Sequence, residues 1–469
     1  MALLPVRSKT RLAFSVAFLL WLVAFILLLN RRLAPSAAES DSHAAGQPPN
    51  SRFLAAEFIN RVEQQQKELQ QLLVESRQLA EALRAQSSIG GNKAGGIGEP
   101  TSPRPVMAKL SPADSLPASI AVLVIACNRP TVRRSLDQIF KYMPTSGPHQ
   151  FHVIVSQDCG HAETASVIQS YGNKLVHIRQ PDLSPISVPA KERALVGYYY
   201  ISRHFRWAFD QVFLTMNYTA AIVVEDDLDI APDFFDYFIH LGRVMAQDPT
   251  VWCVSAWNDN GKSNLIDTAR SDLFYRTDFF PGLGWMLLRP TWLELRTGWP
   301  AAYWDDHMRK AGVRRGRACL RPEVSRSYTF GRVGVSNGLY FDKYLRFIEL
   351  SKRPVNYAAM DLSYLLKSNY DSYYLDRVYK LPSVTLDIAL GVGSGAPAEV
   401  RVQYNGPKEF VAMAKRLDIM PDFKDGVARC AYSGVVPVFK SGRRIHLAPG
   451  RPWKGYDVNL EVIDCFVVF

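Results

Sequence analysis

Three consecutive carboxylates, Glu225, Asp226 and Asp227, end an apolar segment at residues 220–227. Ligands of parallel sheets bind beyond the carboxyl ends of the strands, which is where these groups would lie. Because side chains alternate faces along a strand, we expect Asp226 to point away from its two neighbours. Carboxylate oxygens suit Mg²⁺ or Mn²⁺, so one carboxylate can hold a cation while another accepts a sugar hydroxyl. A solvated acidic turn before Pro232 is the alternative.

Three other polar residues follow apolar segments or lie nearby: Arg129, Asp158 and His204. Each is a weak signal alone, because a single histidine or arginine more often makes a surface or core contact. Together with the acidic triplet at one sheet edge, they would supply an arginine, carboxylates and a metal. Those groups are what a nucleotide diphosphate needs for charge neutralisation and orientation.

Aromatic residues and glycines are concentrated between residues 252 and 306. In PGLGW, Gly282 and Gly284 permit close approach of the backbone to a ligand, whereas simple turn chemistry with Trp285 in the core is the alternative. The adjacent carboxylates Asp305 and Asp306 lie beside aromatic rings, which suit sugar faces. One of them can act as a general base, and an acidic helix start is the other interpretation.

The elements that position these residues follow from apolar segments that alternate with helical ones. Strands are predicted at 120–127, 151–158 and 175–178, with helices at 131–142 and 163–171 between them. This alternation indicates a largely parallel sheet with helices on both faces. A longer helix at 192–213 leads into the acidic triplet, and three segments after residue 398 (EVRVQYNG, GVVPVF and RRIHLAP) predict strands of a smaller domain.

An apolar run at residues 12–29 follows the basic segment 1–11. A helix over this run would be about 27 Å long at about 1.5 Å per residue, enough for a thin bilayer. The basic segment favours the cytosolic side, which predicts a single-pass type II anchor with a lumenal head. Small residues at 34–38 leave a cleaved signal peptide as the alternative.

Residues 30–117 are expected to hold the head away from the membrane. Apolar residues at helical spacing predict an amphipathic helix at 52–87 that can mediate self-association. A segment rich in Gly, Ser and Pro follows it and is typical of a flexible linker.

Charge and cysteine content narrow the class of protein further. Lys and Arg number 55 against 44 Asp and Glu, a formal charge of +11, but no basic run reaches five residues, which disfavours a nucleic-acid partner. None of the six cysteines forms a C-x-x-C motif. In an oxidising lumen we expect structural disulfides, and the spacing alone leaves all fifteen complete pairings open.

Several motifs, in order, closely resemble the animal N-acetylglucosaminyltransferase I family: VEDDL, CVSAWNDNG, YRTDFFPGLGW, WDD, GRACLRPE and RRIHLAP. The resemblance implies a GT-A fold at 118–331, that is, a Rossmann-like mixed sheet with helices on both faces. It also implies a linker and donor-closing loop at 332–367 and a smaller β-containing domain at 368–457. The tail at 458–469 extends past the usual end of the family, and the resemblance does not explain it.

The resemblance also implies a reaction: transfer of GlcNAc from UDP-GlcNAc, with Mn²⁺, in β-1,2 linkage to the α-1,3-arm mannose of Man5GlcNAc2 on glycoproteins. This step would take place at the Golgi membrane. A related transferase with another mannose acceptor and a non-catalytic lumenal glycan-binding protein are the alternatives.

Site residues are implied position by position. Uridine-binding positions match Arg129, Asp158 and His204, a nucleotide-sugar contact matches Asp226, the Mn²⁺ ligand matches Asp227, the catalytic base matches Asp305, and a donor contact in the closing loop matches Ser336. The implied disulfides are Cys127–Cys159 and Cys253–Cys319. Cys430 and Cys465 are left without an implied partner.

Two departures lie beside these positions. Asn128 replaces an acidic residue of the family and Asn337 replaces a histidine, and neither change removes a proposed catalytic group. Asn217 begins the one N-x-[ST] sequon with a permitted middle residue. Because it directly precedes the predicted strand, we expect burial to limit its glycosylation.

Overall fold

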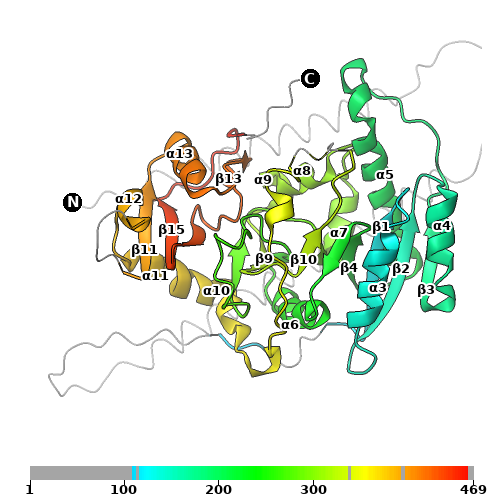
Figure 1. Cartoon of the computed structure of the whole chain (residues 1–469), viewed down its shortest axis with the longest axis horizontal. Helices are drawn as coiled ribbons and strands as arrows, with labels where there is room; N and C mark the ends of the chain where they lie inside the picture. Colours follow the sequence, from blue (N-terminus) through cyan, green and yellow to red (C-terminus); the bar gives the residue numbers. More distant parts are fainter. Residues whose placement is uncertain (1–107, 112–115, 336–337, 339, 392–396, 463–469) are drawn as a thin grey trace, which may run out of the picture. The chain divides into compact units, whose positions relative to one another are not determined.

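A computed structural model describes residues 108–111, 116–335, 338, 340–391 and 397–462 (Figure 1). They belong to one unit, Pro103–Phe469. The predicted anchor at 12–29, the stalk helix at 52–87 and the last seven residues lie outside the described residues. Within the described ranges, no helix is both long enough and apolar enough to cross a membrane.

An eight-stranded sheet in the order β3-β2-β1-β4-β8-β6-β9-β7 forms the centre of this unit. Its first half is parallel and consists of β1 (Ser119–Ala126), β2 (Gln150–Gln157), β3 (Leu175–Arg179) and β4 (Ala220–Glu225). Ile125 of β1 pairs with Glu225 of β4, so the carboxyl ends of these two neighbouring strands lie side by side. The predicted parallel arrangement is confirmed for this half.

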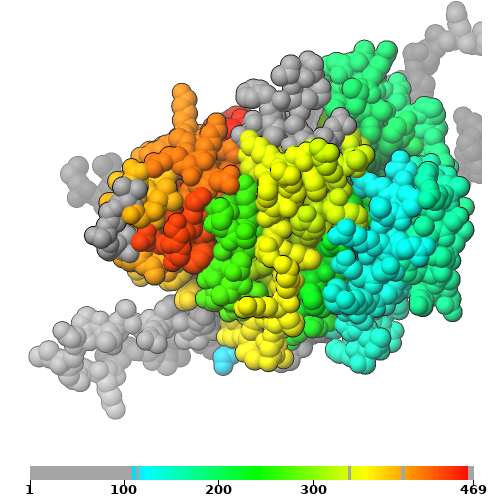
Figure 2. All heavy atoms as spheres, in the orientation of Figure 1, coloured from blue at the N-terminus to red at the C-terminus, as the bar shows by residue number. Residues whose placement is uncertain are grey.

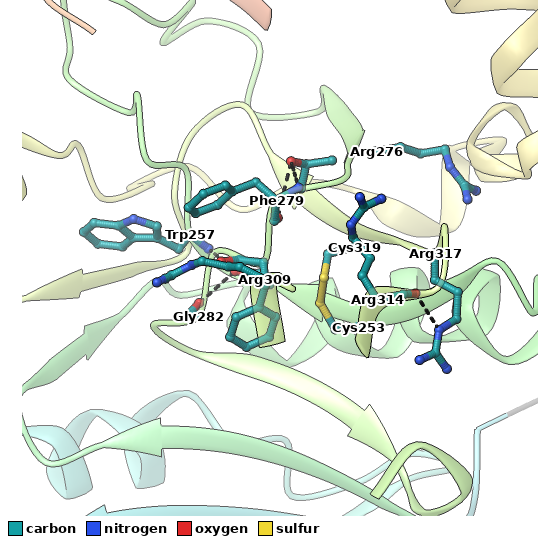
Figure 3. The surroundings of a disulfide bond; sticks show 12 residues. Cys253, Trp257, Arg276, Phe279, Gly282, Arg309, Arg314, Arg317 and Cys319 are labelled. Carbon is teal, nitrogen blue, oxygen red and sulfur yellow. Dashed lines mark hydrogen bonds between the residues drawn. A yellow bond between two sulfur atoms is a disulfide. The ribbon is translucent and has the colours of Figure 1, made fainter. Parts of the chain in front are cut away.

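The second half of the sheet is mixed rather than parallel. It contains β6 (Val251–Ser255), β7 (Phe274–Thr277), β8 (Trp285–Leu288) and β9 (Ala318–Pro322). β8 runs antiparallel to both β4 and β6, β9 runs parallel to β6, and β7 runs antiparallel to β9. The disulfide Cys253–Cys319 joins β6 to β9 (Figure 3).

Both faces of the sheet are buried, and alternate residues of β1 belong to two different hydrophobic clusters. Ile120, Val122 and Val124 belong to one hydrophobic cluster, which includes α3 (Val132–Tyr142) and α6 (Phe234–Gln247). The residues between them belong to a second cluster, which includes residues of α5 (Val196–Asp210), α7 (Arg289–Arg296) and α8 (Trp304–Arg309). The period of two places successive side chains on opposite faces, so the prediction of helices on both faces is confirmed.

The predicted helix at 192–213 is three joined segments. A 3-10 turn at Ala190–Leu195 precedes α5 (Val196–Asp210), and a π-helical turn at Gln211–Thr215 follows it. Pro189 is the residue directly before the first turn. Figure 1 shows α5 near the ends of β1 and β2, and its buried residues pack with those of β1.

A three-stranded sheet lies in the C-terminal part of the chain, in the order β11-β15-β14, with bounds Glu399–Tyr404, Arg443–Pro449 and Val436–Lys440. These are the three strands predicted there. Leu265 O accepts from Phe439 N at 2.9 Å, and Ala431 O accepts from Asp278 N at 2.7 Å. Figure 2 shows this orange-to-red segment lying against the green and yellow segments. The domain boundaries at 331 and 367 stay predictions.

Shorter elements connect these parts: α4 (Ala162–Gln169), β5 (Leu228–Ile230), α7 (Arg289–Arg296), α8 (Trp304–Arg309), α9 (Ala311–Arg314), β10 (Ser327–Thr329), α10 (Lys367–Tyr370), α11 (Asp376–Lys380), α12 (Leu386–Ala389), α13 (Pro407–Leu417), β12 (Phe423–Lys424) and β13 (Val427–Ala428). β12 and β13 form an antiparallel hairpin.

Candidate active site

The acidic triplet meets an arginine where β1 and β4 end side by side. Arg129 follows β1, and its Nη1 lies 2.8 Å from Asp226 Oδ1 and 2.6 Å from Asp227 Oδ2. The backbone N–H of Cys127 donates to Asp226 Oδ2 at 3.2 Å. One guanidinium and one amide therefore bind carboxylates that come from about 100 residues further along the chain.

The expectation that Asp226 points away from Asp227 is wrong. Both carboxylates contact the same nitrogen of Arg129. The physical reason is that β4 ends at Glu225 and the chain turns there, so the alternation that holds within a strand does not extend to Asp226 and Asp227.

Burial raises the pKa values of all three carboxyl groups of the triplet. Burial, followed by the charges of Asp227 and Asp226, raises the pKa of Glu225 to about 8. Burial also raises the pKa of Asp226 to about 6, against the attraction of Arg129. The pKa of Asp227 is raised for the same reason. Asp226 and Asp227 share the single Nη1 of Arg129, and a further cation beside them would relieve the repulsion between the two carboxylates.

A backbone segment after β10 lies directly against the triplet. Phe330 N donates to Asp227 O at 2.9 Å, and Arg129 Nη2 donates to Val333 O at 2.8 Å. A Cβ at Gly331 would lie 1.8 Å from Asp227 Oδ2, so only glycine fits there. Ser336, implied as a donor contact, and Asn337 lie outside the described residues, whereas the segment that leads to them reaches the site.

Asp158 follows β2, on the other side of β1 in the sheet. Its backbone N–H donates to Ala126 O at 2.9 Å, and the disulfide Cys127–Cys159 joins the two strand ends. Burial raises the pKa of the Asp158 carboxyl. Asp158 is therefore held next to the segment that carries Arg129.

His204 lies on α5, which covers this part of the sheet. Its Nε2 is 2.7 Å from Ser156 Oγ, two residues before Asp158. Burial lowers the pKa of His204 to about 3, so the imidazole is neutral at physiological pH. A neutral ring in this position can exchange hydrogen bonds with a base but cannot neutralise phosphate.

Asp305 and Asp306 occupy the first turn of α8. Arg309 Nη1 lies 2.7 Å from Asp305 Oδ2 and 2.8 Å from Asp306 Oδ1. Asp306 is bound a second time, because Lys424 Nζ lies 3.0 Å from its Oδ2. Burial opposes ionisation of Asp306, but Arg309 and Lys424 outweigh it and lower the pKa.

The helix start is close to the triplet. The charge of Asp305 is among the causes that raise the pKa of Glu225, after burial and the charges of its two neighbours. The Asp305 side chain is 41% exposed, and its Oδ1 has no hydrogen-bond partner among the residues that the structure describes. The two aspartates form an acidic helix start, which is the second interpretation, and Asp305 Oδ1 is free to accept a hydrogen bond.

The aromatic residues near this helix are mostly core. Trp285 is 2% exposed and lies against Trp304, with 5.9 Å between ring centroids. Gly282 and Gly284 have φ of 70° and 85°, which only glycine adopts readily. In PGLGW, the interpretation of turn chemistry with a core tryptophan is therefore correct.

Comparison with known proteins decides the family. The model of the GNT-I family matches residues 14–460. The chain belongs to the GNT-I family. It is 38% identical over 344 residues to "Alpha-1,3-mannosyl-glycoprotein 2-beta-N-acetylglucosaminyltransferase" of Arabidopsis thaliana, over 73% of this chain and 76% of that protein. This family member is accordingly a glycosyltransferase of N-glycan processing.

Two solved structures are distantly similar to this GNT-I family member. One is the mannosyltransferase PcManGT from Pyrobaculum calidifontis in complex with GDP-Man and Mn²⁺, with TM-score 0.30, 15% identity and coverage of 48% of this chain and 61% of that one. The other is S. aureus TarS 1–349 in complex with UDP-GlcNAc, with TM-score 0.30, 12% identity and coverage of 46% and 59%. Both alignments span less than two thirds of the solved chain.

The sequence did not single out two residues that belong to the site of this GNT-I family member. Arg309 had a usable signal, because it lies three and four residues after two aspartates in a helix. Lys424 had none, since it is 118 residues away in the sequence from Asp306.

Outside the site, one expectation is wrong. Asn217 is exposed rather than buried, and its Oδ1 accepts a hydrogen bond from Arg289. It lies in a turn with φ of 61°, just before β4 begins.

Cys430 is buried, its Sγ donating to Asn258 Oδ1 at 3.3 Å, whereas Cys465 lies beyond the last described residue.

Proposed function

We propose that this chain transfers GlcNAc from UDP-GlcNAc, with Mn²⁺ and with inversion, in β-1,2 linkage to the α-1,3-arm mannose of Man5GlcNAc2 on glycoproteins. Family membership and the name of the Arabidopsis relative support the reaction. The observation that carries the proposal at the site is the convergence of Arg129, Asp226 and Asp227 at adjacent strand ends. A GT-A fold agrees with the mixed sheet and its helices on both faces.

The donor set is suited to a hard divalent cation. No group of three or more His, Cys, Asp or Glu side chains that could hold a metal is found among the described residues. Asp227 would instead hold the ion as the single protein ligand, with phosphate oxygens and water at its other positions. Carboxylate and phosphate oxygens are the ligands that Mn²⁺ accepts, and Asp226 and Asp227 already converge on one nitrogen of Arg129. When bound, Mn²⁺ neutralises charge on the departing diphosphate.

The protein residues bind and orient the donor. Arg129 supplies guanidinium donors to the uridine part of the donor, and Asp226 accepts from a sugar hydroxyl. Asp158 and the neutral His204 lie at the next strand end and on the covering helix, where a uracil base can exchange hydrogen bonds with them. Ser336 follows the segment that already contacts Arg129, which supports its role as a donor contact.

Asp305 takes the acceptor proton in this proposal. The donor is α-linked and the product β-linked, so direct displacement inverts the anomeric carbon and needs no enzyme nucleophile. The mannose 2-hydroxyl must lose its proton to a positioned base. Arg309 holds Asp305 Oδ2 in place, and Oδ1 is left to accept the proton.

The cellular setting is part of the proposal. The apolar run at 12–29 with its basic N-terminal flank supports a type II anchor in the Golgi membrane, with the head in the lumen. The disulfides Cys127–Cys159 and Cys253–Cys319 agree with an oxidising compartment. The amphipathic segment at 52–87 supports self-association through the stalk.

The test combines two measurements on the full chain. UDP release from UDP-GlcNAc is measured with Man5GlcNAc2 and with synthetic mannosides, and the product linkage is determined by NMR. We expect acceptor-dependent UDP release and a β-1,2 linkage on the α-1,3-arm mannose. A different linked mannose would favour the related transferase, and acceptor binding without UDP release would favour the glycan-binding protein.

A further inference from the structure

The hairpin β12–β13 contacts the helices that follow the acidic pair. Asp425 Oδ2 accepts from Ala311 N, the first residue of α9, at 2.8 Å. One residue earlier, Lys424 Nζ reaches Asp306 Oδ2 at 3.0 Å. Consecutive residues of one hairpin therefore bind both α8 and α9, from more than 100 residues further along the chain.

Lys424 and Arg309 both contact Asp306, and Arg309 also contacts Asp305. Arg309 Nη1 contacts both Asp305 and Asp306. Lys424 offers Asp306 a second cation, so Asp306 does not depend on Arg309 alone. The four groups then carry two negative and two positive charges, and Arg309 stays within 2.7 Å of Asp305 Oδ2.

Arg309 is also held by groups other than the two aspartates. Its Nε donates to Phe280 O at 3.2 Å, and its guanidinium lies 4.8 Å from the ring centroid of Phe279 (Figure 3). Arg429 lies on the same ring at 5.0 Å and is held by Asp259 and Asp422. These contacts hold the Nε end and the ring face of Arg309, so what a change at Asp306 can alter is how the shared Nη1 is divided between Asp305 and Asp306.

We propose that Lys424 is a positioning residue for the reaction, acting through Asp306 to keep Arg309 on Asp305. The inference rests on the proposed function, in which Asp305 is the base. It assigns the C-terminal hairpin a role in turnover: the hairpin holds the charge balance at the start of α8 while the donor is bound elsewhere.

Other titratable and charged groups face this cluster and are part of its pH response. They are Glu225 from β4, Tyr198 from α5, Tyr303 before α8, Glu461 beside Lys424, and Asp259 and Arg429 behind Arg309. Removing the positive charge of Lys424 leaves the carboxylates with excess negative charge, which favours their protonated forms. Because the base must be deprotonated, the acidic limb of the kcat profile should move to higher pH.

Lys424→Met in the full chain tests the inference. We expect kcat to fall by about tenfold, with little change in the KM for UDP-GlcNAc, and the acidic limb of the kcat profile to move to higher pH. Lys424→Arg should restore most of both. Lys408→Met, an exposed lysine on α13 of the same part of the chain, is the matched control and should behave as the unaltered protein.

A second variant separates positioning from general damage to the fold. Asp306→Asn removes a negative charge beside Asp305 and should shift the acidic limb downward, opposite to Lys424→Met. Adding Lys424→Met to Asp306→Asn should lower kcat little further. Independent, multiplying losses, or shifts in the same direction, would overturn the inference. If Asp305→Asn keeps its turnover, the proposed base has failed; if it loses turnover while Lys424→Met is normal, only the positioning role has failed.

Discussion

Arg129 Nη1 lies 2.6 Å from Asp227 Oδ2, which joins the end of β1 to the turn that follows β4. The same nitrogen also contacts Asp226. The carboxylate proposed as the metal ligand is thus already bound to a cation that belongs to the protein. Donor binding would add the charge of a metal and of a diphosphate to this pair, so Arg129 and Asp227 should respond together to the donor.

Asp227→Asn should weaken donor binding and activity together. The change removes a negative charge from the proposed Mn²⁺ ligand and from the pair with Arg129. We expect the affinity for UDP-GlcNAc to fall by at least about tenfold and excess Mn²⁺ to restore part of it. Titration of donor binding at several Mn²⁺ concentrations measures this. Normal activity at limiting Mn²⁺ would place the metal at another residue.

Gly331→Ala should abolish most of the activity without removing any polar group. The new Cβ would lie 1.8 Å from Asp227 Oδ2, so the carboxylate or the segment after β10 must move. A displacement of this size costs about 100-fold in turnover. Gly298→Ala is the control, because a Cβ there meets no atom within 4 Å. Equal activities of the two variants would show that the segment does not approach Asp227 in the active enzyme.

Periodicity and residue type predicted the existence of single strands and helices well, because each of these depends on a local pattern. The strands that carry Arg129, Asp158 and the acidic triplet are present, and their order brings these residues to one edge. Strand direction in the second half was harder, because β6, β7, β8 and β9 are apolar segments whose pairing depends on long loops. The predicted orientation of Asp226 was wrong because the end of a strand cannot be located to one residue from its sequence pattern.

The contact between Asp306 and Lys424 is of a kind that could not be predicted from the sequence. Lys424 belongs to a two-residue strand, β12, and nothing in its neighbourhood distinguishes it from a surface lysine. Its role depends on how the C-terminal segment packs on the large sheet. Such contacts follow from tertiary packing, which a single sequence does not encode as a local pattern.

His204→Gln should make the free energy of unfolding less dependent on pH below about 6.5. Burial lowers the pKa of His204 to about 3 in the folded chain, whereas an unfolded histidine titrates near about 6.5. Between these values the unfolded chain binds the extra proton, so stability is present above about pH 6.5 and falls by about 1.4 kcal/mol per pH unit as pH decreases. Urea unfolding at pH 5 and pH 7 measures the difference. An unchanged pH dependence would contradict the buried, neutral state of His204.

A chain that begins at Met107, placed behind a cleavable secretion signal, should fold, be secreted and be fully active, because residues 1–106 contain no proposed site residue. It keeps Ala108, whose backbone exchanges hydrogen bonds with Asn369 at 3.0 and 2.8 Å, and the buried Leu116. A chain that begins at Ile120 loses both and should unfold at a lower temperature. Thermal unfolding and specific activity of the two chains are compared. A normally folded chain from Met107 that cannot turn over would show that the N-terminal segment takes part in catalysis.

Single-turnover kinetics of Asp305→Asn and Asp306→Asn, with UDP-GlcNAc affinity measured on the same samples, test the central claim most directly. Both residues contact Arg309 in the first turn of α8, so each variant controls for the structural effect of the other. A positioned general base contributes about 10²- to 10⁴-fold. We predict that Asp305→Asn loses turnover by this factor with donor affinity nearly unchanged, and that Asp306→Asn loses much less. A larger loss in Asp306→Asn, or loss of donor binding in Asp305→Asn, would contradict the assignment of Asp305 as the base.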